Sequence, residues 1–246
     1  MRMAPITRET GGGFPSAGAH PRTPPAHEMA GNGRSVARTS GYGYTSGMEH
    51  HDPRLARLRA VLEQRPARRA ARSPGVREAA VAVVLRPRES IEVLLIQRAI
   101  QENDPWSGHM AFPGGRRDPD DPDLIATAFR ETSEETGVPL ARTGKLIGAL
   151  DEVAPANPRL PPILIAPFVT SVPPDTDAVP NPREVQAAIW VPLPALRDES
   201  AATSILVRLE GGSLSFPALR YGDYEIWGLT RRILLQFLEV AREAGI

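Results

Sequence analysis

Three glutamates near the middle of the chain are spaced as ligands of a divalent metal ion would be. Glu131, Glu134 and Glu135 occupy positions i, i+3 and i+4 of the segment DLIATAFRETSEETG. In a helix these positions share one face, where like charges repel one another. Hard carboxylate oxygens grouped in this way are the ligands that Mg²⁺ and Mn²⁺ prefer. The other interpretation, an acidic face turned to solvent, would be the better one for an isolated E-x-x-E-E.

Signals at both ends of the segment predict the helix that must carry the glutamates. Asp121 is suited to the N-cap, Pro122 to the first helical position, and Gly137 to the left-handed residue after the last turn. At 100° per residue the apolar side chains fall on one face, which must be buried. That face is formed by Leu124, Ile125, Ala128, Phe129 and Thr132.

The residue types around the glutamates make the metal interpretation the stronger one. The segment Arg130-Glu131-x-x-Glu134-Glu135-x-Gly137 fixes five residue types at set spacings, and a Gly-Gly pair precedes it. It resembles the second half of the signature of the Nudix hydrolase family, G-x5-E-x7-R-E-U-x-E-E-x-G-U, where U is apolar. One position differs, where a threonine replaces the usual aliphatic residue.

The first half of the signature is less regular. Counting back from the arginine places Pro122 at the early Glu position and Arg116 at the Gly position. The Gly-Gly pair lies one and two residues earlier, so the loop is slightly longer than usual. We expect Asp120 or Asp121 to replace the early Glu, which is mainly structural in the family.

The resemblance implies an α/β fold, the Nudix-type α/β/α sandwich with a mixed central sheet. It also implies a diphosphatase that hydrolyses a nucleoside-diphosphate-linked substrate with Mg²⁺ or Mn²⁺. Carried over by position, Glu131, Glu134 and Glu135 would bind the metal. Glu134 and Arg130 would be catalytic, with Arg130 orienting Glu131. The ions would withdraw charge from the bridging phosphates and lower the pKa of a bound water, which attacks phosphorus.

Candidates for the remaining site residues lie outside the helix. A further carboxylate often serves as a base or extra ligand in this family, and we expect it to be Glu184, with Glu152 as the rival. Arg98, at the end of a predicted strand, is suited to a substrate phosphate, although a surface ion pair is an equal alternative. The expected substrate-binding set is Arg98, Gly114, Gly115 and Arg116, and Arg117 flanks the same loop.

Aromatic and histidine side chains are weaker candidates. Packed aromatics and hydrogen-bonded histidines are more common than pocket-lining ones. The residues in question are Trp106, His109, Tyr221 and Tyr224, while Trp227 is expected in the core and the His50–His51 pair has no third ligand nearby.

Further segments resemble the coenzyme A diphosphatase branch of the family. The Asp-rich loop GGRRDPDDPD, with its extra residue, and the C-terminal YEIWGLTRRIL are typical of that branch. The segment LLIQRAIQENDPWSGHMAFPGG stands where the branch has a signature ending in A-F-P-G-G. It departs from that signature at Arg98-Ala99, where Arg-Ser is usual, and at residues 106–109, where His-x-Gly-Gln is usual. The branch implies coenzyme A or a derivative as substrate, with 3′,5′-ADP and 4′-phosphopantetheine as products.

The remaining pattern predicts three regions. Residues 1–50 are rich in Gly, Pro and Ser, bury little apolar surface and are expected to be disordered. Residues 51–77 comprise an accessory helix over 53–64, capped by Asp52, and a basic linker. Residues 78–246 form the Nudix domain, and the resemblance covers 78 to about 240. Its strands are expected over 79–86, 91–98, 145–153, 163–172 and 187–193, and a short apolar run over 109–113 ends in the break Pro113-Gly114-Gly115. One helical turn is expected at 194–198, a hairpin over 203–210 and 213–219 around Gly211-Gly212, and a closing helix over 229–243.

Composition excludes several classes of protein. The 246 residues contain no cysteine, which rules out disulfides, thiol catalysis and Cys-ligated metals. Acidic and basic residues balance at 29 each, so a coat for nucleic acid or membrane is not expected. No apolar run reaches the roughly 20 residues of a membrane span. We expect a cytoplasmic protein whose partner is a small nucleotide, without membrane or nucleic acid, and a homodimer is compatible with the sequence.

Three alternatives stay open at this stage. The first is a Nudix hydrolase of ADP-ribose, a nucleotide sugar or an oxidised nucleotide. The second is a non-catalytic Nudix-like nucleotide sensor, against which the intact glutamates count. The third is hydrolysis of RNA ends assisted by the basic linker, which predicts steeply salt-dependent RNA affinity.

Overall fold

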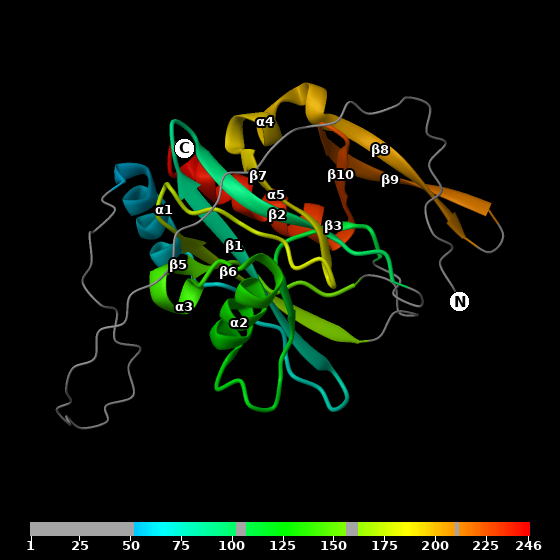
Figure 1. The fold of residues 1–246 in the computed structure, drawn as a ribbon, viewed down its shortest axis with the longest axis horizontal. Helices are drawn as coiled ribbons and strands as arrows, with labels where there is room; N and C mark the ends of the chain where they lie inside the picture. Colours follow the sequence, from blue (N-terminus) through cyan, green and yellow to red (C-terminus); the bar gives the residue numbers. More distant parts are fainter. Residues whose placement is uncertain (1–51, 102–106, 156–161, 210–211) are drawn as a thin grey trace, which may run out of the picture. The chain divides into compact units, whose positions relative to one another are not determined.

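The computed structural model describes residues 52–101, 107–155, 162–209 and 212–246 (Figure 1). The predicted disordered segment 1–50, the His50–His51 pair and Trp106 lie outside the described residues. In chain order the elements are α1 (Pro53–Gln64), β1 (Arg77–Pro87), β2 (Ile91–Arg98), β3 (Met110–Ala111), β4 (Gly114–Arg116), α2 (Leu124–Thr136), α3 (Leu140–Thr143), β5 (Lys145–Ala149), β6 (Ile163–Ser171), β7 (Val185–Pro192), α4 (Leu193–Arg197), the 3₁₀ turn η1 (Glu199–Ala201), β8 (Ala202–Leu209), β9 (Gly212–Tyr221), β10 (Tyr224–Trp227) and α5 (Gly228–Glu243).

The main sheet is mixed, as predicted. Its strand order is β3-β2-β1-β6-β5, with β4 also paired to β1 and β7 to β2. The β1–β6 pair is parallel over nine residues, whereas β2, β4, β5 and β7 join their neighbours in antiparallel pairs. Parallel pairing requires a long crossover, and α2, α3 and β5 lie within the one that connects β1 to β6.

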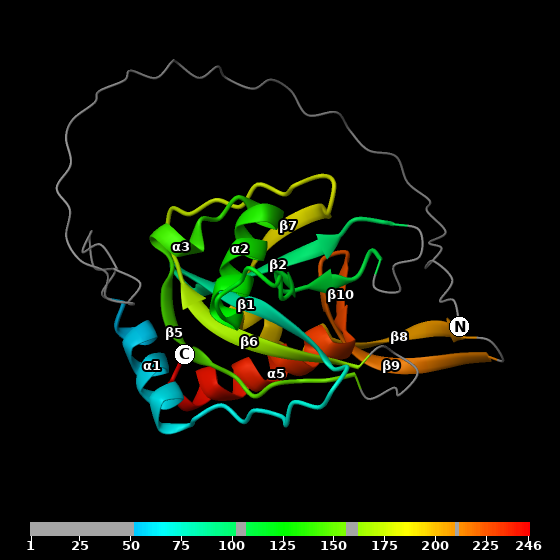
Figure 2. The ribbon, with the colours of Figure 1, turned by 90° about the horizontal axis from the view of Figure 1, so that it is seen from below.

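Alternation of side chains along β1 supplies a core on each face of this sheet. Val83 and Leu85 pack into the cluster shared with α1 and α5. Ala82 and Val84 point to the opposite face and pack with Phe129 of α2. Figure 2 shows α2 and α5 on opposite sides of the sheet, so the chain forms the expected α/β/α sandwich.

The N-terminus of α2 differs from the prediction. The N-cap is Asp123, whose carboxylate accepts a hydrogen bond from the Ala126 N–H at 2.8 Å, and the helix begins at Leu124. Asp121 was wrongly expected in this role because its carboxylate is held instead by Arg130 and Thr127. The other end is as predicted, since Gly137 ends the helix with a left-handed φ of 68°.

A second sheet of three strands, in the order β10-β9-β8, leads into α5. The predicted hairpin is present as β8 and β9, with its turn residues 210–211 outside the described residues. Figure 1 shows this hairpin projecting from the sandwich. Trp227, at the end of β10, is half-buried rather than part of the core, because it packs between His109 and Phe216.

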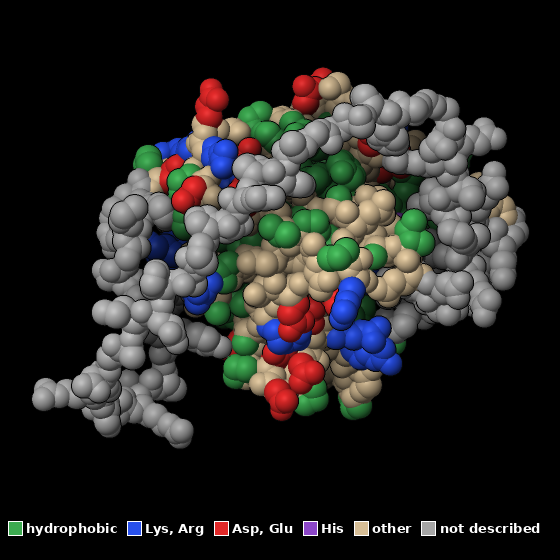
Figure 3. Space-filling view, viewed as in Figure 1, with side chains coloured by type: hydrophobic (Ala, Val, Ile, Leu, Met, Phe, Trp, Pro, Cys, Tyr) green, Lys and Arg blue, Asp and Glu red, His purple; other side chains and the backbone are tan. Residues whose placement is uncertain are grey.

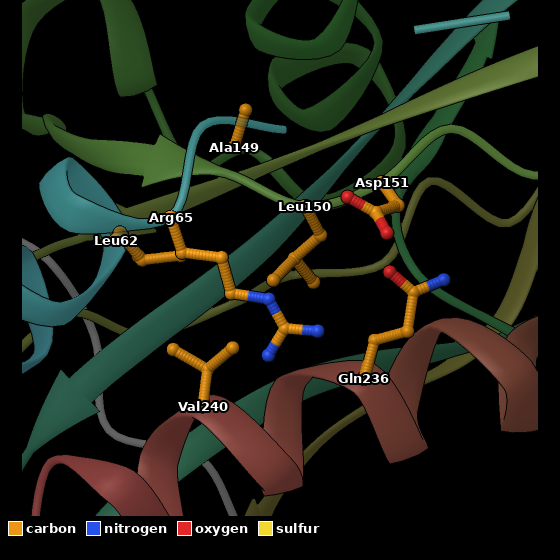
Figure 4. A pocket seen from close by; sticks show the side chains of 7 residues that line it. All are labelled: Leu62, Arg65, Ala149, Leu150, Asp151, Gln236 and Val240. Carbon is orange, nitrogen blue, oxygen red and sulfur yellow. The ribbon is translucent and has the colours of Figure 1, made fainter. Parts of the chain in front are cut away.

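The accessory helix α1 and the linker that follows are attached to the domain. Leu55, Leu58 and Leu62 of α1 are buried against β5 and α5. Where the three elements meet, a cavity of about 10 Å³ has room for roughly one water molecule (Figure 4). The Arg65 guanidinium lies beside it and forms long ion pairs with two glutamates of α5.

Residues of the basic linker are mostly exposed, as expected, but are paired with carboxylates. Arg72 binds Glu152 at 2.6 Å and Glu78 at 2.8 Å. The Arg68 N–H donates to Asp151, and the Ala70 N–H donates to Glu152. This charge pairing leaves the linker poorly suited to act as a free polycationic arm for RNA. Among the helices of the described residues, none is long and apolar enough to cross a membrane.

Candidate active site

Glu135 occupies the most enclosed position among the three predicted metal ligands. Its residue is 3% exposed, and its Oε2 accepts a hydrogen bond from the Gly114 N–H at 2.8 Å. Burial above all, together with the charges of Glu131 and Glu184, raises the pKa of Glu135 to about 8. The Gly114 N–H and the charge of Arg98 act in the opposite direction. A carboxylate is thus kept in a place where its negative charge is poorly solvated.

Glu131 lies against the second glycine of the loop. A Cβ added to Gly115 would overlap the Glu131 carboxylate, and one added to Gly114, whose φ is +150°, would overlap the backbone of β1. The loop therefore needs both glycines to approach α2 this closely. Burial raises the pKa of Glu131, Arg130 lowers it, and the charges of Glu134 and Glu184 raise it again.

Arg130 is the centre of the charged network beside the loop. Its Nε and Nη2 bind the Asp121 carboxylate, each at 3.0 Å, and its Nη1 lies 2.9 Å from Glu131 and 3.1 Å from Glu134. Asp121 is 7% exposed and also accepts hydrogen bonds from the Asp118 N–H and the Thr127 hydroxyl. These bonds, that from Arg130 above all, hold the pKa of Asp121 well below its usual range. Of the two aspartates expected to replace the early Glu, Asp121 is therefore the one that contacts Arg130.

The three glutamates share a helix face, but the described residues contain no His, Asp or Glu group of three already arranged to hold a metal ion. Glu134 is 51% exposed and leans on Arg130, as Glu131 does, while Glu135 faces Gly114. The donor set nevertheless fits a divalent cation, because it offers hard oxygens whose charge the protein solvates poorly. Glu131 and Glu134 would turn away from Arg130 to reach such an ion.

The two candidates for the outer carboxylate occupy different surroundings. Glu184 is exposed at the start of β7, and its carbonyl accepts the Ala99 N–H at 2.8 Å. Its charge raises the pKa of both Glu131 and Glu135, after larger contributions from burial. Glu152 instead has both carboxylate oxygens bound by Arg72, and this pairing lowers its pKa. The arrangement favours Glu184 as the outer carboxylate.

The arginines considered for phosphate binding lie near the loop and differ in the groups that they contact. Arg98 follows an irregularity in the β2–β7 register, a place where a strand often redirects a side chain, and its charge reaches Glu135. Arg116 is exposed at the end of β4, and its carbonyl accepts from Arg130. Arg117 is tied to Glu78 at 3.0 Å and to two loop carbonyls, which makes it part of the fold. The Gly114 N–H is already used by Glu135.

The aromatic candidates fall into two groups. His109 lies edge-on to Trp227, with ring centroids 4.7 Å apart, just before β3. Tyr221 and Tyr224 pack against the core cluster on the α5 side. Trp227 and Thr230, which contact the segment before the Gly-Gly loop, were not singled out as site residues from sequence. The I-W-G-L-T segment was the available signal.

Carboxylates and guanidinium groups gather on one face of the domain. In Figure 3 acidic and basic side chains lie side by side over the region of α2 and the loop before it. The surrounding surface is mostly apolar or uncharged in that view. A substrate carrying phosphates would find both signs of charge there, the basic groups to bind it and the acidic groups to hold cations.

A protein-family model and several curated proteins match this chain. Residues 76–208 match the NUDIX domain model. An uncharacterized protein of Schizosaccharomyces pombe is 42% identical over 118 residues, which are 47% of this chain and 36% of that protein. The uncharacterized Nudix hydrolase NudL of Yersinia pestis is 33% identical over 154 residues, 63% of this chain and 73% of that protein. The chain thus matches about a third of the yeast protein's length.

Solved structures with a similar fold include a MutT/nudix family protein from Enterococcus faecalis. Its TM-score is 0.49 at 16% identity, and the match covers 77% of this chain and 70% of that one. A Caenorhabditis elegans Ap4A hydrolase in a binary complex has a TM-score of 0.41 at 23% identity, covering 48% and 82%. The family model covers more than half of the chain, and the NudL match extends over most of that relative; the chain therefore belongs to the Nudix hydrolase family, a class of diphosphatases acting on nucleoside-diphosphate-linked substrates.

Proposed function

We propose that this protein is a divalent-metal-dependent diphosphatase whose substrate is coenzyme A or a derivative. The observation that carries the hydrolase part is the setting of Glu131 and Glu135. Both carboxylates lie against the Gly114–Gly115 loop, and burial raises the pKa of each. Such a site favours the arrival of positive charge and is costly for the fold alone.

The residues proposed to hold the cation are Glu131, Glu134 and Glu135. When bound, Mg²⁺ or Mn²⁺ supplies Lewis acidity, withdrawing charge from the bridging phosphates and activating water for attack on phosphorus. Arg130 orients Glu131, and Asp121 fixes the Arg130 guanidinium from its other side. Glu134, being exposed, is free to swing between Arg130 and the ion.

Other residues are proposed to handle the proton and the substrate. Glu184 accepts the proton of the attacking water, a role that its position beside Glu131 and Glu135 supports. Arg98 and Arg116 bind substrate phosphates, because a guanidinium matches the geometry of phosphate oxygens. The backbone of Gly114 keeps Glu135 in place and leaves the substrate room to approach the loop.

The choice of coenzyme A rests on segments that resemble one branch of the family. One of them, I-W-G-L-T, contacts the two residues that directly precede another, A-F-P-G-G. The Thr230 hydroxyl donates to the Met110 carbonyl at 2.9 Å, and Trp227 packs on His109. The longer Asp-rich loop is accommodated because Asp121 folds back onto Arg130. These contacts support treating the segments together as evidence for the coenzyme A diphosphatase branch.

The test is a substrate panel with a matched pair of variants. Cleavage of coenzyme A, ADP-ribose, NADH and a dinucleoside polyphosphate is measured with Mg²⁺ or Mn²⁺ for wild type, Glu134→Gln and Glu63→Gln. Glu63 is an appropriate control because it is exposed and forms an ion pair with Arg59, four residues before it. Glu134 is likewise exposed and forms an ion pair with Arg130, four residues before it. Loss of a metal ligand should lower kcat by about a hundredfold or more, equivalent to roughly 3 kcal/mol of barrier.

The outcomes distinguish a coenzyme A diphosphatase from a diphosphatase of another substrate and from a nucleotide sensor. Cleavage of coenzyme A that collapses in Glu134→Gln and persists in Glu63→Gln supports the proposal. Cleavage of another substrate keeps the diphosphatase and overturns the coenzyme A assignment. No cleavage with either metal, together with nucleotide binding, would indicate a sensor.

A further inference from the structure

We infer that Trp227, at the end of β10, and Thr230, in the first turn of α5, are positioning residues for the Gly114–Gly115 loop. They lie more than a hundred residues after the loop in sequence, and neither belongs to the signature that carries the glutamates. Their action passes through β3, the two-residue strand that enters the loop. The inference rests on the proposed hydrolase function for its kinetic readout only.

The strand β3 has little pairing of its own. It joins β2 through Gln97 opposite Met110 and Ile96 opposite Ala111, and this is its only strand pairing among the described residues. A pair of this length is weakly held, because each residue contributes few ladder hydrogen bonds. Additional contacts must therefore decide where β3 and the following loop lie.

Those contacts come from the start of α5. The Thr230 hydroxyl donates to the Met110 carbonyl at 2.9 Å. The Trp227 ring lies edge-on to His109, with ring centroids 4.7 Å apart, and also contacts Phe216. Both β3 and the residue before it are therefore held in place. Deeply buried side chains anchor the helix itself, with Leu234 and Phe237 at 0% exposure. A firmly packed helix thus fixes a short strand.

Small shifts of the loop would displace the carboxylates of Glu131 and Glu135. Gly114 donates its N–H to Glu135, and Gly115 has no space between its Cα and the Glu131 carboxylate. On its other side the loop is fixed to β1, where the Ala82 N–H donates to the Pro113 carbonyl at 2.9 Å. Contacts with α5 at Met110 and with β1 at Pro113 therefore hold the loop from both sides of Phe112. A misplacement of about 1 Å near a reacting centre can cost about a hundredfold in rate.

The experiment compares Thr230→Val with Thr230→Ser. Valine keeps the shape of threonine and removes the donor, whereas serine keeps the donor. Arg232→Ala is the matched control, since it removes another hydrogen bond from α5 to a loop, that from Arg232 to the Ala154 carbonyl. Hydrogen exchange of the Gly114 amide is followed by NMR in glycine-labelled protein, alongside kcat and KM for the substrate that wild type cleaves.

We expect Thr230→Val to speed exchange of the Gly114 amide by about tenfold and to lower kcat by about tenfold, with KM nearly unchanged. Thr230→Ser and Arg232→Ala should both resemble wild type. Unchanged exchange in Thr230→Val, unchanged kcat, or an effect on KM alone would overturn the inference. If Thr230→Val does not fold, Trp227→Leu is measured in its place against the same criteria.

The amide measurement separates this inference from the proposed function. It needs no substrate and no metal, so it can be made even if wild type cleaves nothing in the panel. In that case faster exchange in Thr230→Val supports the positioning role, and unchanged exchange overturns it.

Discussion

Two groups of glutamates in this molecule lie in surroundings that shift their pKa values in opposite directions. Glu78 and Glu152 lie with Arg72 at the linker, and hydrogen bonds from arginines lower the pKa of both. Glu131 and Glu135 lie on α2 beside the Gly-Gly loop, and burial raises the pKa of both. The same residue type is thus stabilised as an anion in one place and destabilised as an anion in the other.

The difference comes from how cations and carboxylates are matched. At the linker, Arg72 binds two glutamates and Arg117 supplies a second cation to Glu78. On α2, Arg130 is shared among Asp121, Glu131 and Glu134, and Glu135 receives a backbone N–H. A matched network contributes to folding, whereas a surplus of carboxylates is favourable only when a ligand brings positive charge. Ion pairs in the first group are therefore expected to matter for stability and carboxylates in the second for activity.

Removal of the outer carboxylate is the strongest test of this division between stabilising and catalytic carboxylates. Glu184→Gln should lower kcat by about a hundredfold, the lower end of the range for general bases. Because Glu184 is exposed and its hydrogen bonds to Ala99 and Asn181 are made by its backbone, the unfolding midpoint should stay close to wild type. Steady-state kinetics and urea unfolding of the same preparation check both statements. A kcat within threefold of wild type would remove Glu184 from the proposed site.

Asp121 belongs to the stabilising kind of carboxylate although it stands beside the active site. Asp121→Asn should lower the free energy of unfolding by about 2 kcal/mol at pH 7, since Arg130 loses its charged, buried partner. The pKa of Asp121 is lowered in the folded state, so its contribution is present above the ordinary Asp pKa of about 4 and is lost as pH falls below it.

Urea unfolding of wild type and Asp121→Asn between pH 7 and pH 3 tests this sign. The difference between the two proteins should be full above about pH 5 and shrink below pH 4. Other titrating carboxylates are common to both proteins and cancel in the difference. A constant difference across this range would show that Asp121 acts through neutral hydrogen bonds alone.

Glu152 should behave as a structural residue despite having been a rival for the base. Its side chain is 4% exposed and accepts from Arg72 and the Ala70 N–H. Glu152→Gln should cost about 1–2 kcal/mol of unfolding free energy and speed amide exchange at Ala70, with kcat unchanged. Thermal unfolding, hydrogen exchange and kinetics together provide the check. A hundredfold loss of kcat without destabilisation would reverse the assignments of Glu152 and Glu184.

Local patterns explain which features could be predicted from the sequence. The helix with the glutamates, its end at Gly137 and the strands β1 and β2 follow from periodicity and turn residues within 10–15 neighbouring positions. The family resemblance added the expected roles of the glutamates, because the spacing R-E-x-x-E-E-x-G is itself local.

Features that depend on the path of a loop or on contacts between distant residues escaped prediction. Asp121 has the residue type and the sequence position of an N-cap. Only the path of loop 116–123 brings its carboxylate onto Arg130, nine residues later. The linker is a basic segment in the sequence, and only folding brings Glu152, eighty residues later, onto Arg72. Likewise, the bond from Thr230 to Met110 spans 120 residues. Side-chain pairing over such separations has no periodic signal in the sequence.

The smallest expected effect isolates geometry from environment. Arg59 and Glu63 of α1 form an i, i+4 ion pair at 3.3 Å, the same spacing as Arg130 and Glu134 at 3.1 Å. Both side chains of the α1 pair are more than 60% exposed, so solvent screens their attraction. Arg59→Ala should therefore change the unfolding free energy by less than about 0.5 kcal/mol, and alanine's helix propensity offsets part of any loss. Urea unfolding measures this, and a loss above 1 kcal/mol would mean that spacing, rather than burial and the balance of charges, separates the two groups of glutamates.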